Sequence, residues 1–153
     1  MGNLIAVDAL SNSASTNSPA VIAQLVMAAP DVDRDVFLQG IPNVAKVAKG
    51  LTLYASANDK ALLLWKRVAG NVPRAGDVPA SGPIVMNPPM TTIDASAIGD
   101  ELFGLNHNAF ATTRNVLNDL KILLESGTPP PRLTEIRAYP EPPQRATYFR
   151  YVP

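Results

Sequence analysis

Three polar residues of the chain could form part of a nucleophilic catalytic site. Asp31 and Asp59 each follow an apolar segment, and His107, the only histidine among the 153 residues, lies in a later polar loop. A carboxylate that contacts an imidazole fixes the tautomer of the ring and stabilises its protonated form. An imidazole held in this way can activate a hydroxyl nucleophile. We therefore expect an acid–histidine pair, with Asp59 or Asp31 as the acid.

Each of these residues also has a simpler interpretation. A single loop histidine is often a solvated side chain, and Asn-Asp after a strand is a common turn. Asp31, Asp33 and Asp35 lack the glycine and the distal glutamate of a calcium loop, so we expect them to supply charge at a helix start. One histidine and no cysteine argue against a tight transition-metal site. We expect no metal and no cofactor.

The elements that would position these residues alternate between helix and strand. Apolar runs predict strands and capping or breaking residues predict helix ends. The expected strands are 21–29, which would be buried on both faces, 51–56 and 91–95. The expected helices are 1–10, one that starts within 31–37, 43–49, 60–68 and 112–126. Gly50 would end helix 43–49, and Gly127 would end helix 112–126. This alternation predicts an α/β fold with a parallel sheet and flanking helices. In such sheets functional groups gather at the carboxyl ends of the strands, where Asp31, Asp59 and His107 would lie.

Two segments are expected outside this core. Residues 69–90 are rich in Gly and Pro and predict a long surface excursion. Residues 128–153 form a proline-rich tail that packs on, or extends from, a main unit of residues 1–127. Within the tail, Tyr148-Phe149-Arg150-Tyr151 is a candidate edge strand.

The composition excludes several classes of partner. Thirteen basic residues balance thirteen acidic ones, which gives no charge argument for binding nucleic acid or an anionic membrane. The longest strongly apolar stretch, 20–30, is too short to cross a bilayer. Residues 1–10 lack the pattern of a signal peptide, so the cytoplasm is the default expectation.

The opening residues Met1-Gly2-Asn3 look like the end of a Gly-x-Ser-x-Gly nucleophile elbow, with Gly2 as its last glycine. Further motifs follow in order: 28–37 (AAPDVDRDVF), 51–62 (LTLYASANDKAL), 74–77 (RAGD), 92–94 (TID) and 104–107 (GLNH). This ordered set resembles a bacterial branch of the alpha/beta hydrolases whose function is uncharacterised. The resemblance covers nearly the whole chain up to about residue 125.

The resemblance implies a serine hydrolase that acts on an ester, thioester or amide. The order of the family is serine, acid, histidine, which implies Asp59 as the acid and His107 as the base. Asp31 is the reserve acid, because some relatives place the acid one strand earlier, and Asp94 ranks third. The serine would precede Met1 directly, and the backbone N–H of Met1 would be an oxyanion-hole donor.

We therefore expect the chain to be the C-terminal half of an alpha/beta-hydrolase fold. It would keep the acid and the histidine but lack the nucleophile, and would be inactive alone. Strand 21–29 would then be an exposed sheet edge, and the chain would be marginally stable or oligomeric. The alternative is a non-enzymatic α/β module that binds or assembles through that edge.

Overall fold

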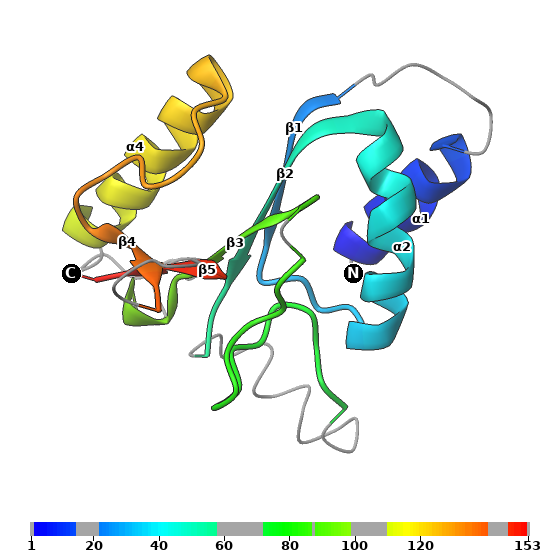
Figure 1. Ribbon diagram of the computed structural model, residues 1–153, viewed down its shortest axis with the longest axis horizontal. Coiled ribbons are helices and arrows are strands. Elements are labelled where there is room, and N and C mark those ends of the chain that lie inside the picture. The colour runs from blue at the N-terminus through cyan, green and yellow to red at the C-terminus, as the bar shows by residue number, and fades with distance from the viewer. Residues whose placement is uncertain are drawn as a thin grey trace.

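The structure is a computed structural model, and it describes residues 2–14, 22–57, 72–86, 88–98, 110–140 and 147–152. These residues form an α/β fold around one sheet, with α1 and α2 on one side of it and α4 on the other (Figure 1). The fold class expected from the sequence is confirmed. No helix in the described parts of the chain is both long and apolar enough to cross a membrane.

The sheet has five strands in the order β1-β2-β3-β5-β4. Strands β1 (Ile22–Ala28), β2 (Ala48–Ala55) and β3 (Thr91–Asp94) pair in parallel, as predicted, and β5 (Tyr148–Tyr151) pairs in parallel with β3. The antiparallel strand β4 (Ile136–Tyr139) was not predicted, and it occupies the edge next to β5. The candidate edge strand in the tail therefore lies inside the sheet.

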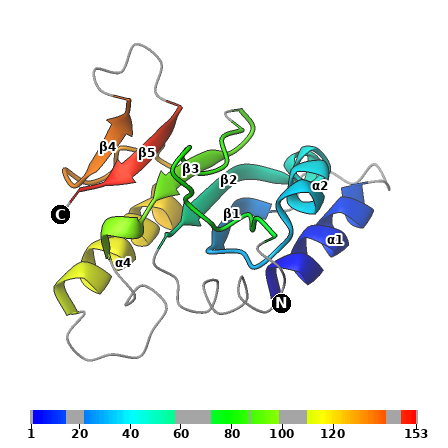
Figure 2. The ribbon, with the colours of Figure 1, turned by 90° about the horizontal axis from the view of Figure 1, so that it is seen from below.

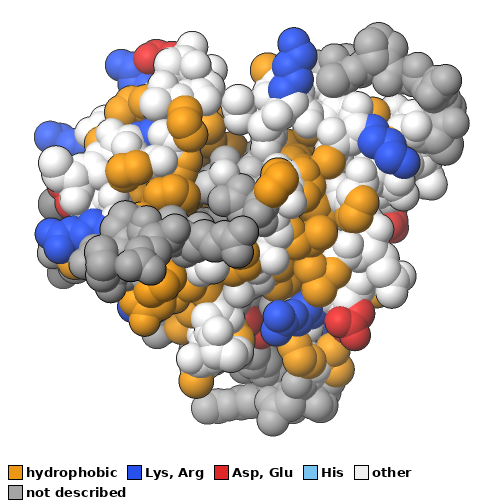
Figure 3. Space-filling view, viewed as in Figure 1, with side chains coloured by type: hydrophobic (Ala, Val, Ile, Leu, Met, Phe, Trp, Pro, Cys, Tyr) orange, Lys and Arg blue, Asp and Glu red, His pale blue; other side chains and the backbone are white. Residues whose placement is uncertain are grey.

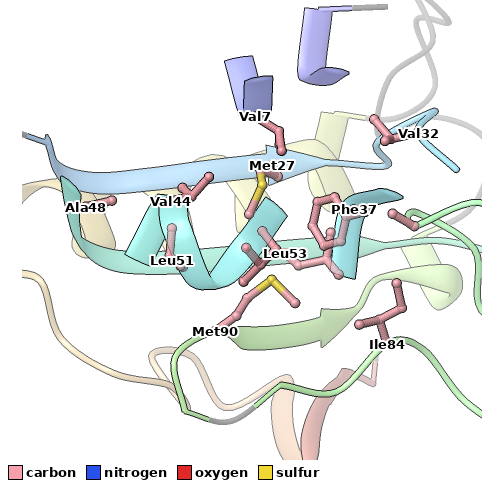
Figure 4. Close-up of a cluster of buried hydrophobic side chains, with 12 residues drawn as sticks. Val7, Met27, Val32, Phe37, Val44, Ala48, Leu51, Leu53, Ile84 and Met90 are labelled. Carbon is pink, nitrogen blue, oxygen red and sulfur yellow. The ribbon is translucent and has the colours of Figure 1, made fainter. Parts of the chain in front are cut away.

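The side chains on the two faces of the sheet form two separate core layers. Leu51 and Leu53 of β2 face α1 (Gly2–Ala14) and α2 (Arg34–Val47), where they pack with Met27, Phe37 and other buried side chains (Figure 4). Tyr54 and Ile93 face α4 (Phe110–Ser126) on the opposite side. Successive side chains of a strand point to opposite faces, so β1 and β2 contribute to both layers, with Met27, Leu51 and Leu53 on one side and Val26 and Tyr54 on the other.

Helix α2 is one continuous element where the sequence predicted two. It contains Pro42, which removes one backbone hydrogen bond and normally disfavours a helix interior. Phe37, Ile41, Val44 and Val47 are all buried on one face of α2. This burial outweighs the local cost of the proline, because most helical stability in proteins comes from packing of an apolar face.

Several other predicted features also differ from the structure. Gly50 does not end a helix but lies within β2, where a Cβ would come within 2.1 Å of the Gln24 side chain. Strand β1 is not buried on both faces, since Met27 is its only buried residue and the strand stands at the sheet edge. The predicted helix 60–68 lies outside the described residues.

Among its described residues, the Gly/Pro-rich segment is a surface excursion only in part. Ala75, Ile84 and Met90 are buried with the side chains of α1, α2 and β2, and the Thr92 hydroxyl donates to the Ile84 carbonyl at 2.7 Å. The described part of this segment therefore completes one side of the core, because glycine and proline content reports backbone geometry and says little about burial.

The end of α4 follows its sequence signal. Gly127 has a φ of +65° and donates its backbone N–H to the Leu123 carbonyl at 2.8 Å. A residue in the left-handed region that closes the last turn is the usual way a helix stops, and glycine adopts it without steric cost.

Candidate active site

The carboxyl ends of β1, β2 and β3 form one continuous edge. The strand register aligns Ala28 with Tyr54 and Tyr54 with Ile93, so the three following loops leave the sheet side by side. This edge points toward the lower part of Figure 1, where the green segment after residue 72 crosses it. Asp31 lies in the first of these loops. Asp59, His107 and Met1 lie outside the described residues.

A tight turn at Arg74–Asp77 connects the first two loops. Its Gly76 N–H donates to the Pro30 carbonyl at 3.0 Å, and the Gly76 carbonyl accepts from the Ser56 N–H at 2.9 Å. The turn is closed by the Asp77 side chain, which accepts from the Arg74 N–H at 3.0 Å. A Cβ at position 76 would lie 2.5 Å from the Ala29 backbone, so glycine is required for this approach.

The backbone at the end of β1 is strained where the turn meets it. Ala29 has a φ of +36°, which is uncommon for a residue with a side chain. Its N–H donates to the Tyr54 carbonyl at 2.8 Å, which fixes it to β2. Hydrogen bonds on both sides thus hold the loop that carries Asp31.

Asp31 is already paired with a cation. Its Oδ1 lies 3.4 Å from Arg74 Nε, and the two side chains are 29% and 18% exposed. Neither atom makes a hydrogen bond to the described chain, so the contact is an ion pair without good hydrogen-bond geometry. A carboxylate neutralised by arginine is a weaker partner for a histidine, so this ion pair disfavours Asp31 as the acid.

The other reserve acid, Asp94, is also engaged. It is buried at the end of β3, where Oδ1 accepts from the Ser96 N–H at 3.0 Å and Oδ2 accepts from Arg150 Nε at 3.1 Å. Asp94 therefore organises the start of the loop after β3 and ties it to β5.

The loops after β2 and β3 contact each other directly. The Ala57 N–H donates to the Ser96 hydroxyl oxygen at 2.8 Å. The Ala95 N–H donates to the Ala55 carbonyl at 2.8 Å, which extends the strand pairing beyond β3. These bonds join the segment that leads to Asp59 with the segment that leads to His107.

The aspartates near the start of α2 serve that helix. Asp33 is its N-cap, and its carboxylate accepts from the backbone N–H groups of Asp35 and Val36 at 2.9 and 3.1 Å. The sequence predicted charge at a helix start for Asp31, Asp33 and Asp35. Asp35 lies in the first turn of α2 and Asp33 caps the helix, whereas Asp31 pairs with Arg74. The described residues contain no group of three potential metal-ligating side chains.

A buried polar triad that the sequence did not predict lies on the α4 side of the sheet. Tyr54 donates its hydroxyl proton to Asp119 of α4, and Arg132 donates to both carboxylate oxygens, at 2.6 Å from Nε and 2.9 Å from an Nη atom. The side chains of Arg132 and Asp119 are 0% and 1% exposed. Burial, followed by the hydrogen bond to Asp119, raises the pKa of Tyr54 well above its ordinary value.

One sequence signal could have found this triad. Asp119 stands among Val116, Leu120 and Leu123, three and four residues apart, where a helix places its core-facing side chains. A carboxylate on an apolar stripe requires a buried partner. No local pattern identifies that partner as Arg132, in the tail.

Residues 1–126 match a family described as an alpha/beta hydrolase of unknown function (DUF900). The match extends over all the helices and strands that form the shared carboxyl edge. The chain belongs to this alpha/beta hydrolase family. Comparisons with curated proteins and with solved structures gave no match. The tail that supplies Arg132, β4 and β5 to this alpha/beta hydrolase lies beyond the matched residues.

Proposed function

We propose that the chain supplies the acid and the general base of an acyl-transfer hydrolase acting on an ester, thioester or amide. His107 takes the proton of a serine nucleophile and returns it to the leaving group, and Asp59 orients the imidazole. In the elbow pattern the serine is the residue before Met1, and the Met1 amide is an oxyanion donor.

The contact between the loops after β2 and β3 carries this proposal. The hydrogen bond from the Ala57 N–H to the Ser96 hydroxyl fixes the two loops to each other. Asp59 follows Ala57 by two residues, and His107 belongs to the chain that continues from Ser96. An acid and a histidine from neighbouring parallel strands need such a junction, because a small misplacement of either group costs rate.

The partners of the other two carboxylates favour Asp59 as the acid. Asp31 is paired with Arg74 and Asp94 with Arg150. For either one to orient a histidine, it would have to give up or share its arginine. The charge that stabilises an imidazolium would then be partly cancelled.

The serines at this edge have structural roles, which supports an external nucleophile. The Ser96 hydroxyl accepts a hydrogen bond from the Ala57 N–H, and Ser56 is buried, with its backbone N–H donating to the Gly76 carbonyl. No glycine pattern of an elbow surrounds either one. Loss of the nucleophile from such a site costs on the order of 10⁶ in turnover, so the proposed activity requires a serine at the elbow position before Met1.

A fluorophosphonate probe tests this proposal on two proteins. The first is the 153-residue chain, and the second is the same chain extended by the in-frame codons upstream of Met1. We expect stoichiometric labelling of one serine in the extended protein only. In the extended protein His107→Ala abolishes labelling, Asp59→Asn lowers turnover by about 10⁴, and Asp31→Asn retains most of it.

Three results would refute the proposal. They are stoichiometric labelling of a serine in the 153-residue chain, a stop codon directly upstream of Met1 in place of Gly-x-Ser codons, and an Asp31→Asn loss as large as that of Asp59→Asn. The last result would make Asp31, which follows β1, the acid in place of Asp59.

A second candidate function, assembly through β1, rests on the position of that strand. Within the described chain β1 pairs only with β2, and it stands first in the sheet order. An unpaired edge can accept a strand from another chain. Ala23 is exposed on this strand, so Ala23→Lys should convert an oligomer to a monomer in analytical ultracentrifugation. A wild-type chain that sediments as a monomer would exclude this function.

A further inference from the structure

The end of the sheet formed by β4 and β5 is covered by α4 on one face, and on the other face Tyr148 is buried while Arg137 and Tyr139 are exposed. Ile136 and Tyr151 pack under α4, together with Val116. The residues that alternate with them in the two strands point to the other face. Figure 2 shows β4 and β5 at the end of the sheet away from α1 and α2. An open pocket of about 310 Å³ is found here, lined by Arg137, Ala138, Tyr139, Pro140, Arg150 and Val152.

The guanidinium of Arg150 is held in one orientation in this pocket. Nε donates to Asp94 Oδ2 at 3.1 Å, and an Nη atom donates to the Tyr148 hydroxyl at 2.9 Å. The carbon at its centre lies 4.2 Å from the ring centroid of Tyr139, in a cation–π contact. The other Nη atom makes no hydrogen bond to the described chain. Arg150 thus offers free donors from a fixed position, and 40% of its side chain is exposed.

Arg137 lies directly opposite Arg150 in the antiparallel ladder. Side chains of opposite residues share a face, and their Cβ atoms are about 4.5–5.5 Å apart. Arg137 is exposed and makes no ion pair or hydrogen bond within the described chain. Two like charges in this arrangement destabilise the strand pair. Asp94 compensates only one of them, so the pocket keeps a positive charge.

The paired arginines concentrate positive charge at one place on a chain whose basic and acidic residues are equal in number. The chain has no net charge, and Figure 3 shows Lys and Arg side chains spread over the face in view. Arginine presents its donors in a planar fork that matches the oxygens of a carboxylate or phosphate. An oxyanion between the two guanidinium groups would use their free donors and remove their repulsion.

We propose that this pocket binds a small oxyanion, a carboxylate or phosphate group, between the guanidinium groups of Arg137 and Arg150. Tyr139 and Asp94 are positioning residues that hold Arg150 in place. The proposal does not depend on the proposed hydrolase function, because it uses only residues of β3, β4 and β5.

The test is a titration of the whole chain with inorganic phosphate and, separately, with sodium acetate, with ionic strength held constant by NaCl. We expect saturable backbone NMR shifts at Arg137, Tyr139 and Arg150 and a rise in Tm with at least one anion. Arg137→Gln should weaken binding at least tenfold and remove the rise in Tm. Without anion, its Tm should equal or exceed that of the wild type, because the repulsion is gone.

Two further variants separate the site from general charge effects. Arg114→Gln removes an exposed arginine on α4 and should bind like the wild type. Arg150→Lys keeps the charge but loses the planar fork, and it should weaken binding with an unchanged circular dichroism spectrum. A response to phosphate alone assigns a phosphate ligand, and one to acetate alone assigns a carboxylate. No saturable response to either anion, wild-type binding by Arg137→Gln, or equal loss in Arg114→Gln would overturn the proposal.

Discussion

Replacing Asp119 by asparagine should strongly destabilise the protein, because it removes the counter-charge of a buried arginine. Asp119 accepts two hydrogen bonds from Arg132 and one from Tyr54, and the Arg132 side chain is 0% exposed. The amide of Asp119→Asn keeps the shape and one acceptor oxygen. It leaves the guanidinium charge unpaired in the interior.

The expected loss is large compared with the stability of a domain. Breaking a buried ion pair from one side costs about 3–5 kcal/mol, whereas whole domains have only about 5–15 kcal/mol. For a protein of this size the loss corresponds to a fall in Tm of roughly 10 °C. Tyr54→Phe removes two hydrogen bonds, one to Asp119 and one from Arg132, and leaves the ion pair, so it should cost about 1–3 kcal/mol.

Urea unfolding followed by far-ultraviolet circular dichroism measures these changes. Glu125→Gln is the matched control, because Glu125 is exposed on the same helix and should change the free energy of unfolding by less than about 0.5 kcal/mol. The double variant Asp119→Leu/Arg132→Met should lose less than Asp119→Asn, since it leaves no unpaired charge. A loss under about 1 kcal/mol for Asp119→Asn, or a double variant less stable than Asp119→Asn, would contradict a buried ion pair at this place.

Three further predictions follow from local contacts. Gly76→Ala should cost about 1–3 kcal/mol in urea unfolding, because its Cβ would overlap the Ala29 backbone; a neutral effect would mean that the turn is not held against β1. Asp33→Ala should cost about 1 kcal/mol in the same assay, because the N-cap of α2 is lost. Asp33→Asn can still cap α2 and should cost much less. Equal losses would mean that the charge of Asp33, and not its capping hydrogen bonds, stabilises the helix. The folded-state pKa of Tyr54 is raised, so its contribution to stability is complete below its unfolded pKa of about 10 and is lost as pH rises above that value. Tyr54→Phe should therefore show a weaker fall in Tm between pH 9 and 11, and an unchanged pH profile would contradict the assigned burial.

The contacts of the Tyr54 triad also show why the tail cannot be treated as an appendage. Arg132 lies beyond the family match, yet its guanidinium is the partner of a helix residue and a strand residue within it. Burial opposes the charge of Arg132, but the bonds to Asp119 outweigh burial and raise its pKa. A protein shortened at residue 126 would leave Asp119 buried and without its arginine.

The sequence by itself determined the elements whose signals are local. Apolar runs predicted strands β1, β2 and β3, a breaker predicted the end of α4 at Gly127, and a cluster of aspartates predicted the acidic start of α2. Parallel pairing followed from the alternation of strands with helices, because a parallel connection needs a crossover. The shared carboxyl edge, where the proposed acid and histidine loops begin, was therefore predictable.

Only the tertiary structure decided the features that depend on distant partners. Helix α2 continues through Pro42 because its buried face packs on the sheet, and a Cβ at Gly40 in the same helix would come within 2.6 Å of Val7 of α1. Arg74 reaches Asp31, and Arg132 reaches Tyr54 across 78 positions of sequence. Local residue preferences depend only on a residue's neighbours within the same turn, helix or strand. Burial and charge pairing depend on which surfaces meet after the chain has folded.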